Sequence, residues 1–212
     1  MADVLNPEKA RIFRITHRDN LPWILDHGLH AQKGASFDAH HRSIGNQDLI
    51  GKRTTHVVSV SPGGTLSDYI SFYFTPFSMM LYNIHTGYNV PKIPNEEIVF
   101  MVSSLHRIAE LQIPFVFTDQ HAFRRTASYF NRLENLDRID WSLLNRRDFK
   151  YDPDDLAKTD RYQAEALIWR HLPLQALLGF GCFTDEVNDW IKTELAARGT
   201  NLKARVQRNW YF

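Results

Sequence analysis

The N-terminal part of the chain changes from alternating to helical spacing of its apolar positions. Residues 11–17, RIFRITH, alternate apolar and polar side chains, which predicts a short strand. The next segment, RDNLPWILDHGL, predicts a helix because Asp19 can cap it, Pro22 fits its first turn and Gly28 can end it. The chain therefore opens with a strand followed by a helix.

Residues 33–64, called the lid segment below, form a long polar stretch rich in Gly, Ser, His and Asn. Loops of this length in compact domains are usually functional lids or disordered. Several specific polar groups favour a lid. Its last part, VVSVSPGG, predicts a brief strand that runs into a turn.

The remaining pattern alternates short apolar strands with short helices. Strands are predicted at 70–74, 96–105, 114–122, 163–169 and 201–212, with a turn and strand within 173–183. Helices are predicted after Pro76, at 105–111, at 127–144 and at 184–199, the last with Thr184 as its cap. This order predicts one α+β domain over residues 1–212, built on a mixed, largely antiparallel central sheet with flanking helices.

Composition narrows the class of protein. The 212 residues are 43% hydrophobic and 23% charged, which is ordinary for a globular protein. The single cysteine, Cys182, excludes an internal disulfide, and no apolar run is long enough to span a membrane. We therefore expect a cytoplasmic protein without membrane contact. The net charge is only +1, so any nucleic-acid contact must depend on local basic clusters.

Glu165 is a carboxylate inside the apolar run QAEALIW. Burial of a carboxylate costs several kcal/mol unless a partner or a function compensates. If this run is a strand, Gln163 and Glu165 lie on the same face and can hold the hydroxyls of a ribose. A carboxylate can also stabilise the oxocarbenium-like state of glycosyl cleavage. The alternative is a structural ion pair with Arg161 or Arg170, which spacing alone favours.

Other polar groups suggest a site without identifying it. Lys52 and Arg53 can bind phosphate oxygens, although solvent-exposed loop charges are the more common explanation. Arg14, Thr16 and His17 lie at a strand end, where they can hold a nucleoside or an amide. Metal-binding spacings are absent from the sequence, so we expect no metal.

Several blocks together resemble the DarT family, the toxins of DarT–DarG toxin–antitoxin systems. They occur in the family's order and cover nearly the whole chain: IFRITHRDNLPWIL, PGGTLSDYISFYFTPFSMMLY, PFVFTDQHAF, RYQAEALIW and the terminal WYF. The resemblance implies an ADP-ribosyltransferase fold related to PARP-like enzymes. It also implies transfer of ADP-ribose from NAD to a base in single-stranded DNA, in a defined sequence context. Thymidine is the expected base, with guanosine left open.

The resemblance assigns roles to individual residues. Glu165 matches the catalytic glutamate, and Arg53, or Lys52 one position earlier, matches the arginine that orients the substrate. The expected NAD contacts are Arg14, Thr16, His17, Asn20, Tyr73, Tyr82 and Gln163, beneath the lid segment, and the expected DNA contacts are Lys52, His121, Arg124 and Arg125. Relatives often carry histidine where this chain has Arg14.

The expected partners are single-stranded DNA and a DarG-like antitoxin whose macrodomain removes the modification. The basic residues Lys203 and Arg205 are further candidates for DNA contact. Two alternatives stay open at this point. One is an NAD-dependent transferase that acts on RNA or protein, and the other is a nucleic-acid-binding module without catalysis.

Overall fold

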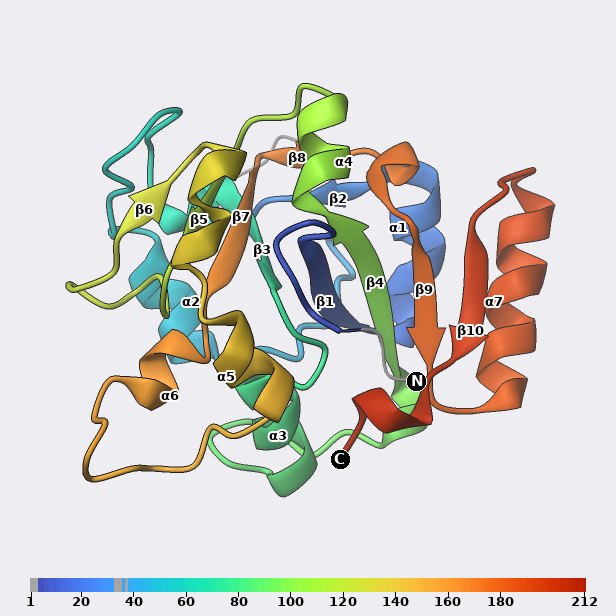
Figure 1. Ribbon diagram of the computed structural model, residues 1–212. Helices are drawn as coiled ribbons and strands as arrows, with labels where there is room; N and C mark the ends of the chain where they lie inside the picture. Colours follow the sequence, from blue (N-terminus) through green and yellow to red (C-terminus); the bar gives the residue numbers. More distant parts are fainter. Residues whose placement is uncertain (1–3, 33–35, 37) are drawn as a thin grey trace.

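The computed structural model describes residues 4–32, 36 and 38–212 (Figure 1). Within them, an 8-stranded sheet has the order β10-β9-β4-β1-β3-β7-β5-β6. Neighbouring strands run antiparallel, except for the parallel pair β9 and β10. The sheet strands are β1 (Arg11–His17), β3 (Tyr69–Tyr73), β4 (Ile98–Ser104), β5 (Phe115–Thr118), β6 (Tyr129–Phe130), β7 (Glu165–Trp169), β9 (Gly179–Cys182) and β10 (Lys203–Val206). The α+β class with a largely antiparallel sheet is confirmed.

Short helices surround this sheet, and α7 runs beside β10 at one edge (Figure 1). The helices are α1 (Leu21–His27), α2 (Gln47–Arg53), α3 (Met79–Thr86), α4 (Leu105–Glu110), α5 (Trp141–Arg146), α6 (Lys158–Arg161) and α7 (Asp185–Ala197). A second, two-stranded sheet pairs β2 (Leu29–His30) with β8 (His171–Leu172). No helix in the described part of the chain is long and apolar enough to cross a bilayer.

Apolar side chains fill both sides of the sheet. On one side, Ile12, Phe72 and Ile168 belong to the main core, which also takes in apolar residues of α1, α5 and α7. On the other side, Phe13 and Phe100 pack with residues of α3 and with Tyr211. Burial of such side chains stabilises the central strands by about 25 cal/mol per Å² of apolar surface. These strands are the scaffold on which the site is built.

Two predicted elements differ from the structure near the chain ends. The residue before α1 is Asn20, because Asp19 belongs to a 3₁₀ turn at Arg18–Asn20. The C-terminal strand covers only Lys203–Val206, and a 3₁₀ turn at Arg208–Trp210 follows it. In both places a 3₁₀ turn replaces regular structure, a common event at element ends.

The helix predicted over 127–144 is wrong. That segment contains β6, a 3₁₀ turn at Leu133–Arg138 and the short α5. The apolar spacing is real, since Leu136 and Ile139 are buried. However, Asp140 caps α5 by accepting the Leu143 N–H, which starts a new helix instead of continuing an old one.

The predicted lid segment contains a helix that its polarity concealed. Asn46 accepts the Leu49 N–H and starts α2, with Asp48 in the first turn and Arg53 in the last. This arrangement of cap and charges is favourable to a helix. The expected strand in VVSVSPGG is reduced to an isolated bridge between Val57 and Thr65. Residues 33–35 and 37 of the segment lie outside the described residues.

Candidate active site

The central sheet opens between β1 and β3. Strand β1 pairs with β4 along its whole length, from Arg11 to His17, but with β3 only where Phe13 lies opposite Tyr73. Beyond that pair the two strands separate. A cavity of about 390 Å³ lies at this opening, lined by β1, β3, α1, α2, the segment 38–46 and Glu165.

Glu165 is the first residue of β7 and is 1% exposed. Its Oε2 accepts a hydrogen bond from Arg53 Nη1 at 3.0 Å, and its Oε1 accepts the Ala122 N–H at 3.0 Å. Burial alone would raise the pKa of Glu165. The charge of Arg53, the charge that His121 carries once it is protonated at low pH, and the Ala122 N–H outweigh it and hold the pKa below its ordinary value. Glu165 is therefore a fixed, ionised carboxylate at neutral pH.

Arg53 reaches Glu165 from the last turn of α2. Its Nη2 also donates to Ser71 Oγ at 2.6 Å, so the guanidinium joins β3 and β7. Its side chain is 13% exposed and lines the cavity, whereas Lys52 is exposed and does not line it. Of the two basic residues considered from the sequence, the geometry brings Arg53 into the site.

The two arginines suggested as structural partners of Glu165 are occupied elsewhere. Arg161 forms a bidentate pair with Asp155, and the guanidinium of Arg170 lies 4.7 Å from the ring centre of Trp169. The ion pair of Glu165 is therefore built inside the cavity. A pair in this position can meet a bound substrate.

Arg14 enters the opening from β1. Its Nη1 donates to the Ser71 carbonyl at 2.8 Å, an acceptor left over where β1 and β3 no longer pair. Burial lowers the pKa of Arg14 to about 10, with Tyr73 opposing and Arg53 adding to the shift. Its Nε is buried without a hydrogen-bond partner among the described residues. Such a donor is costly unless a ligand supplies an acceptor.

The turn after β5 holds the other side of Glu165. Thr118 Oγ1 accepts the Glu165 N–H at 3.2 Å, and Tyr129 donates its hydroxyl to the Ala122 carbonyl. The Ala122 peptide is thus held at both ends, by Glu165 on its N–H and by Tyr129 on its carbonyl. Burial raises the pKa of Tyr129 to about 12, which keeps this hydroxyl protonated as a donor.

His121 lies in the same turn and faces the Arg53–Glu165 pair. Burial lowers its pKa; the charge of Glu165 opposes the shift, and Arg53 adds to it. The imidazole is therefore neutral at pH 7. Its Nδ1 accepts the Phe123 N–H at 3.2 Å, which leaves the proton on Nε2. His121 consequently offers a neutral N–H donor.

Three expected NAD contacts near the end of β1 have different surroundings. Thr16 lines the cavity, and its hydroxyl accepts a hydrogen bond from Asn20. Asn20 does not line the cavity; its amide bonds the backbone of Arg42 twice and ties the lid segment to α1. His17 bonds Glu97 at 2.9 Å, also away from the cavity. Asn20 and His17 therefore have structural contacts in place.

Of the tyrosines and the glutamine expected to contact NAD, only Tyr73 lines the cavity. Tyr73 lines the cavity opposite Glu165 in the β3–β7 register. Tyr82 lies on α3, where it packs against Phe149 and Phe212 outside the cavity. Gln163 precedes β7 in a turn, and its amide donates to the Thr159 carbonyl. The shared strand face inferred for Gln163 and Glu165 is therefore wrong, because the strand starts at Glu165.

None of the four expected DNA contacts lines the active-site cavity: Lys52, His121, Arg124 and Arg125. Arg124 and Arg125 follow His121 and are exposed, and Arg124 pairs with Asp160 at 2.8 Å. Lys52 is exposed on α2. The sequence reasoning missed Ser71, the Ala122 N–H and Tyr129, because their importance depends on contacts distant in the chain. Among the described residues, no group of three or more His, Cys, Asp or Glu side chains is placed so that it could hold a metal ion.

Known proteins resemble this chain over nearly its whole length. It is 51% identical over 209 residues to a DNA ADP-ribosyl transferase of Escherichia coli O127:H6, covering 98% of this chain and 96% of the relative. The structure of Thermus sp. 2.9 DarT in complex with ADP-ribosylated ssDNA matches with a TM-score of 0.90, 29% identity and full coverage of both chains. The same protein in complex with NAD+ matches with a TM-score of 0.84 at 30% identity, covering 97% and 99%.

Fold and site together define an NAD-dependent ADP-ribosyltransferase that acts on DNA. Residues 13–212 match the family described as "ssDNA thymidine ADP-ribosyltransferase, DarT". The chain belongs to the DarT family. The sequence had left open a transferase that acts on RNA or protein and a nucleic-acid-binding module without catalysis, and both are thereby set aside.

Proposed function

We propose that Glu165 and Arg53 catalyse the transfer of ADP-ribose from NAD to thymidine in single-stranded DNA, in a defined sequence context. The observation that carries this assignment is the ionised Glu165, fixed by Arg53 and the Ala122 N–H in a cavity between β1 and β3. A preorganised charge of this kind stabilises a developing opposite charge without reorganisation. Glycosyl cleavage of NAD develops positive charge on its ribose.

NAD would occupy the cavity with its nicotinamide ribose toward Glu165. Arg14 supplies the unpartnered Nε donor for an oxygen of NAD, and Thr16 and Tyr73 supply further lining groups. The described part of the lid segment lines the cavity through His41, among others. Because Asn20 ties this segment to α1 through Arg42, we propose that it covers bound NAD.

The reaction then needs few protein groups. The bond between C1′ of the ribose and the nicotinamide nitrogen breaks, and nicotinamide leaves with the electron pair. Glu165 stabilises the oxocarbenium, and thymine N3 attacks C1′. The N3 proton passes to a free lone pair of Glu165 and on to solvent. Arg53 and the Nε2–H of His121 would polarise the thymine carbonyls, which makes N3 easier to deprotonate. Positioning and electrostatics supply the rate.

A panel of acceptors tests this function. Labelled NAD is incubated with single-stranded DNA, duplex DNA, RNA or bulk protein, and the nucleosides of the product are identified by mass spectrometry. We expect label only in single-stranded DNA, on thymidine N3. Label on guanosine would change the assigned base, and label in RNA or protein alone would overturn the DNA assignment.

We also propose an antitoxin partner that contains a macrodomain and removes the ADP-ribose from DNA. This proposal rests on the family resemblance. The modified oligonucleotide should return to its original mass when a macrodomain hydrolase of a DarT–DarG system is added. A product that stays modified would contradict it.

A further inference from the structure

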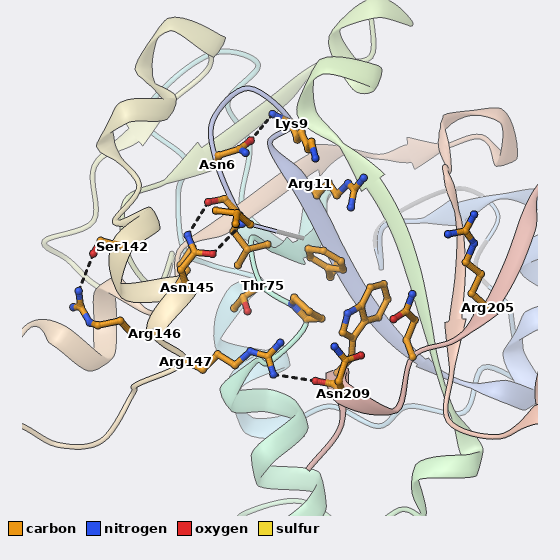
Figure 2. A pocket seen from close by; sticks show the side chains of 17 residues that line it. Asn6, Lys9, Arg11, Thr75, Ser142, Asn145, Arg146, Arg147, Arg205 and Asn209 are labelled. Carbon is orange, nitrogen blue, oxygen red and sulfur yellow. Dashed lines mark hydrogen bonds between the residues drawn. The ribbon is translucent and has the colours of Figure 1, made fainter. Parts of the chain in front are cut away.

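A second and larger cavity lies outside the active site. It measures about 820 Å³, against about 390 Å³ for the cavity at Glu165. Figure 2 shows it beside β1, bounded by the N-terminal segment, by the end of α5 and by the C-terminal segment. We call it the basic cavity. Its lining contains Lys9, Arg11, Arg146, Arg147 and Arg205, and no aspartate or glutamate among the described residues.

Two of these cations are exposed toward solvent and lack a carboxylate partner in the described part of the chain. Arg146 donates only to Ser142 Oγ, at 2.8 Å, and Arg205 lies on β10 (Figure 2). Arg147 is held in place, because it donates to the Asn209 carbonyl at 3.0 Å and lies 5.1 Å from the ring centre of Phe77. In a chain of net charge +1, this is a strong local concentration of positive charge.

The rest of the lining suits a nucleic-acid strand better than an acidic protein surface. Asn209 and Gln207 add side-chain amides that can bond base edges. Trp210 adds an aromatic ring, held edge-on against Phe13 and Phe100 with centroids 5.3 Å away in each case. Sites that bind single-stranded nucleic acid usually combine cations, which contact the phosphates, with aromatic rings, on which the bases stack.

The basic cavity is a neighbour of the active site. Phe13 lines the basic cavity, and Tyr73, its partner in the β1–β3 pairing, lines the active-site cavity. We propose that the basic cavity binds a part of the same single-stranded DNA that lies several nucleotides away from the modified thymidine. This inference rests on the proposed function. Arg205, which the sequence suggested as a DNA contact, would bind DNA in this cavity.

The test compares a short oligonucleotide, little longer than the target motif, with a long one that carries the same motif. The variant R146A/R205A removes two exposed cations and leaves the supporting contacts of Arg147 intact. R138A is the matched control, since Arg138 is exposed and lines neither cavity. Steady-state kinetics and the salt dependence of KM are measured for each protein, with a melting curve to verify folding.

We expect R146A/R205A to raise KM for the long oligonucleotide about tenfold. For that substrate, the slope of log KM against log salt concentration should become shallower. The decrease should be about 1 for each phosphate that the protein no longer neutralises. Kinetics with the short oligonucleotide, and all kinetics of R138A, should match the wild type. Unchanged KM on both lengths would overturn the inference, as would an equal rise on both. Wild-type protein that modifies neither oligonucleotide would instead refute the proposed function itself.

Discussion

Arg53 and Glu165 are 112 positions apart in the chain, yet Nη1 of the arginine lies 3.0 Å from Oε2 of the glutamate. The contact joins the end of α2 to the start of β7, and both residues line the cavity. The same guanidinium holds Ser71. The site therefore depends on one side chain that donates in two directions.

The double contact of Arg53 predicts that a lysine cannot replace it. R53K keeps the positive charge but has no planar fork with which to hold Glu165 and Ser71 at once. We expect kcat to fall by about 10²-fold, in the range typical for removal of one donor that stabilises a transition state. K52A, one position away and exposed, is the control and should keep kcat within about twofold of the wild type. An equal fall in both variants would mean that α2 contributes only its charge.

Tyr129 should act as a positioning residue through the Ala122 peptide. Y129F removes only the hydroxyl that donates to the Ala122 carbonyl. The peptide whose N–H holds Glu165 is then left without its second support, and removal of a hydrogen bond of this kind costs about 1 kcal/mol of stability. We expect kcat to fall about tenfold with KM for NAD unchanged.

The comparison that isolates Tyr129 is the split between kcat and KM, measured beside the melting temperature. A variant that melts earlier but keeps its kcat would show that the hydroxyl only stabilises the turn.

Three partly buried histidines should make folding stability depend on pH. The pKa of His121 is lowered, chiefly by burial, and so are those of His41 and His56. Below the ordinary histidine value of about 6.5 the unfolded chain binds more protons than the folded one. The free energy of unfolding should therefore be greatest above this pH and decline as the pH falls through the lower folded-state pKa values.

H121N removes one of these groups and should make the decline below about pH 6.5 less steep. Denaturant unfolding of both proteins at a series of pH values measures the difference. H40N is the control, because His40 is exposed and lines neither cavity. Identical pH profiles for H121N and the wild type would show that folding does not lower the pKa of His121.

The sequence predicted the scaffold better than the geometry of the site. Alternation and helix caps identified β1, β3, β4 and α7, because these elements bury regular faces. The helix α2 was missed although Asn46 and Asp48 form an ordinary start signal. Its polar surface gives it no apolar stripe to detect. Gln163 was misplaced because the exact start of a strand depends on tertiary pairing, here of Glu165 with Tyr73.

The residues of the site could be predicted from the sequence to different degrees. Glu165 stood out because a carboxylate within an apolar run is costly. The choice between Lys52 and Arg53 needed the helix register, which places one outward and the other inward. Ser71 and the Ala122 N–H are ordinary groups that become functional only where separate segments meet. The pattern of residues within one segment does not show which distant segments it will contact.

Glu165→Gln tests the central claim most directly, measured as single-turnover transfer of ADP-ribose to single-stranded DNA beside the binding of NAD. Glutamine keeps the shape but has one acceptor oxygen for two donors, so stability should fall by about 1–3 kcal/mol while the protein still folds. We expect NAD to bind within a few-fold of the wild type and the transfer rate to fall by at least about 10³-fold, because glutamine carries no charge to oppose the oxocarbenium. Transfer at a near-wild-type rate, in a protein that has only become less stable, would mean that Glu165 is a structural ion-pair member and that catalysis depends on another group.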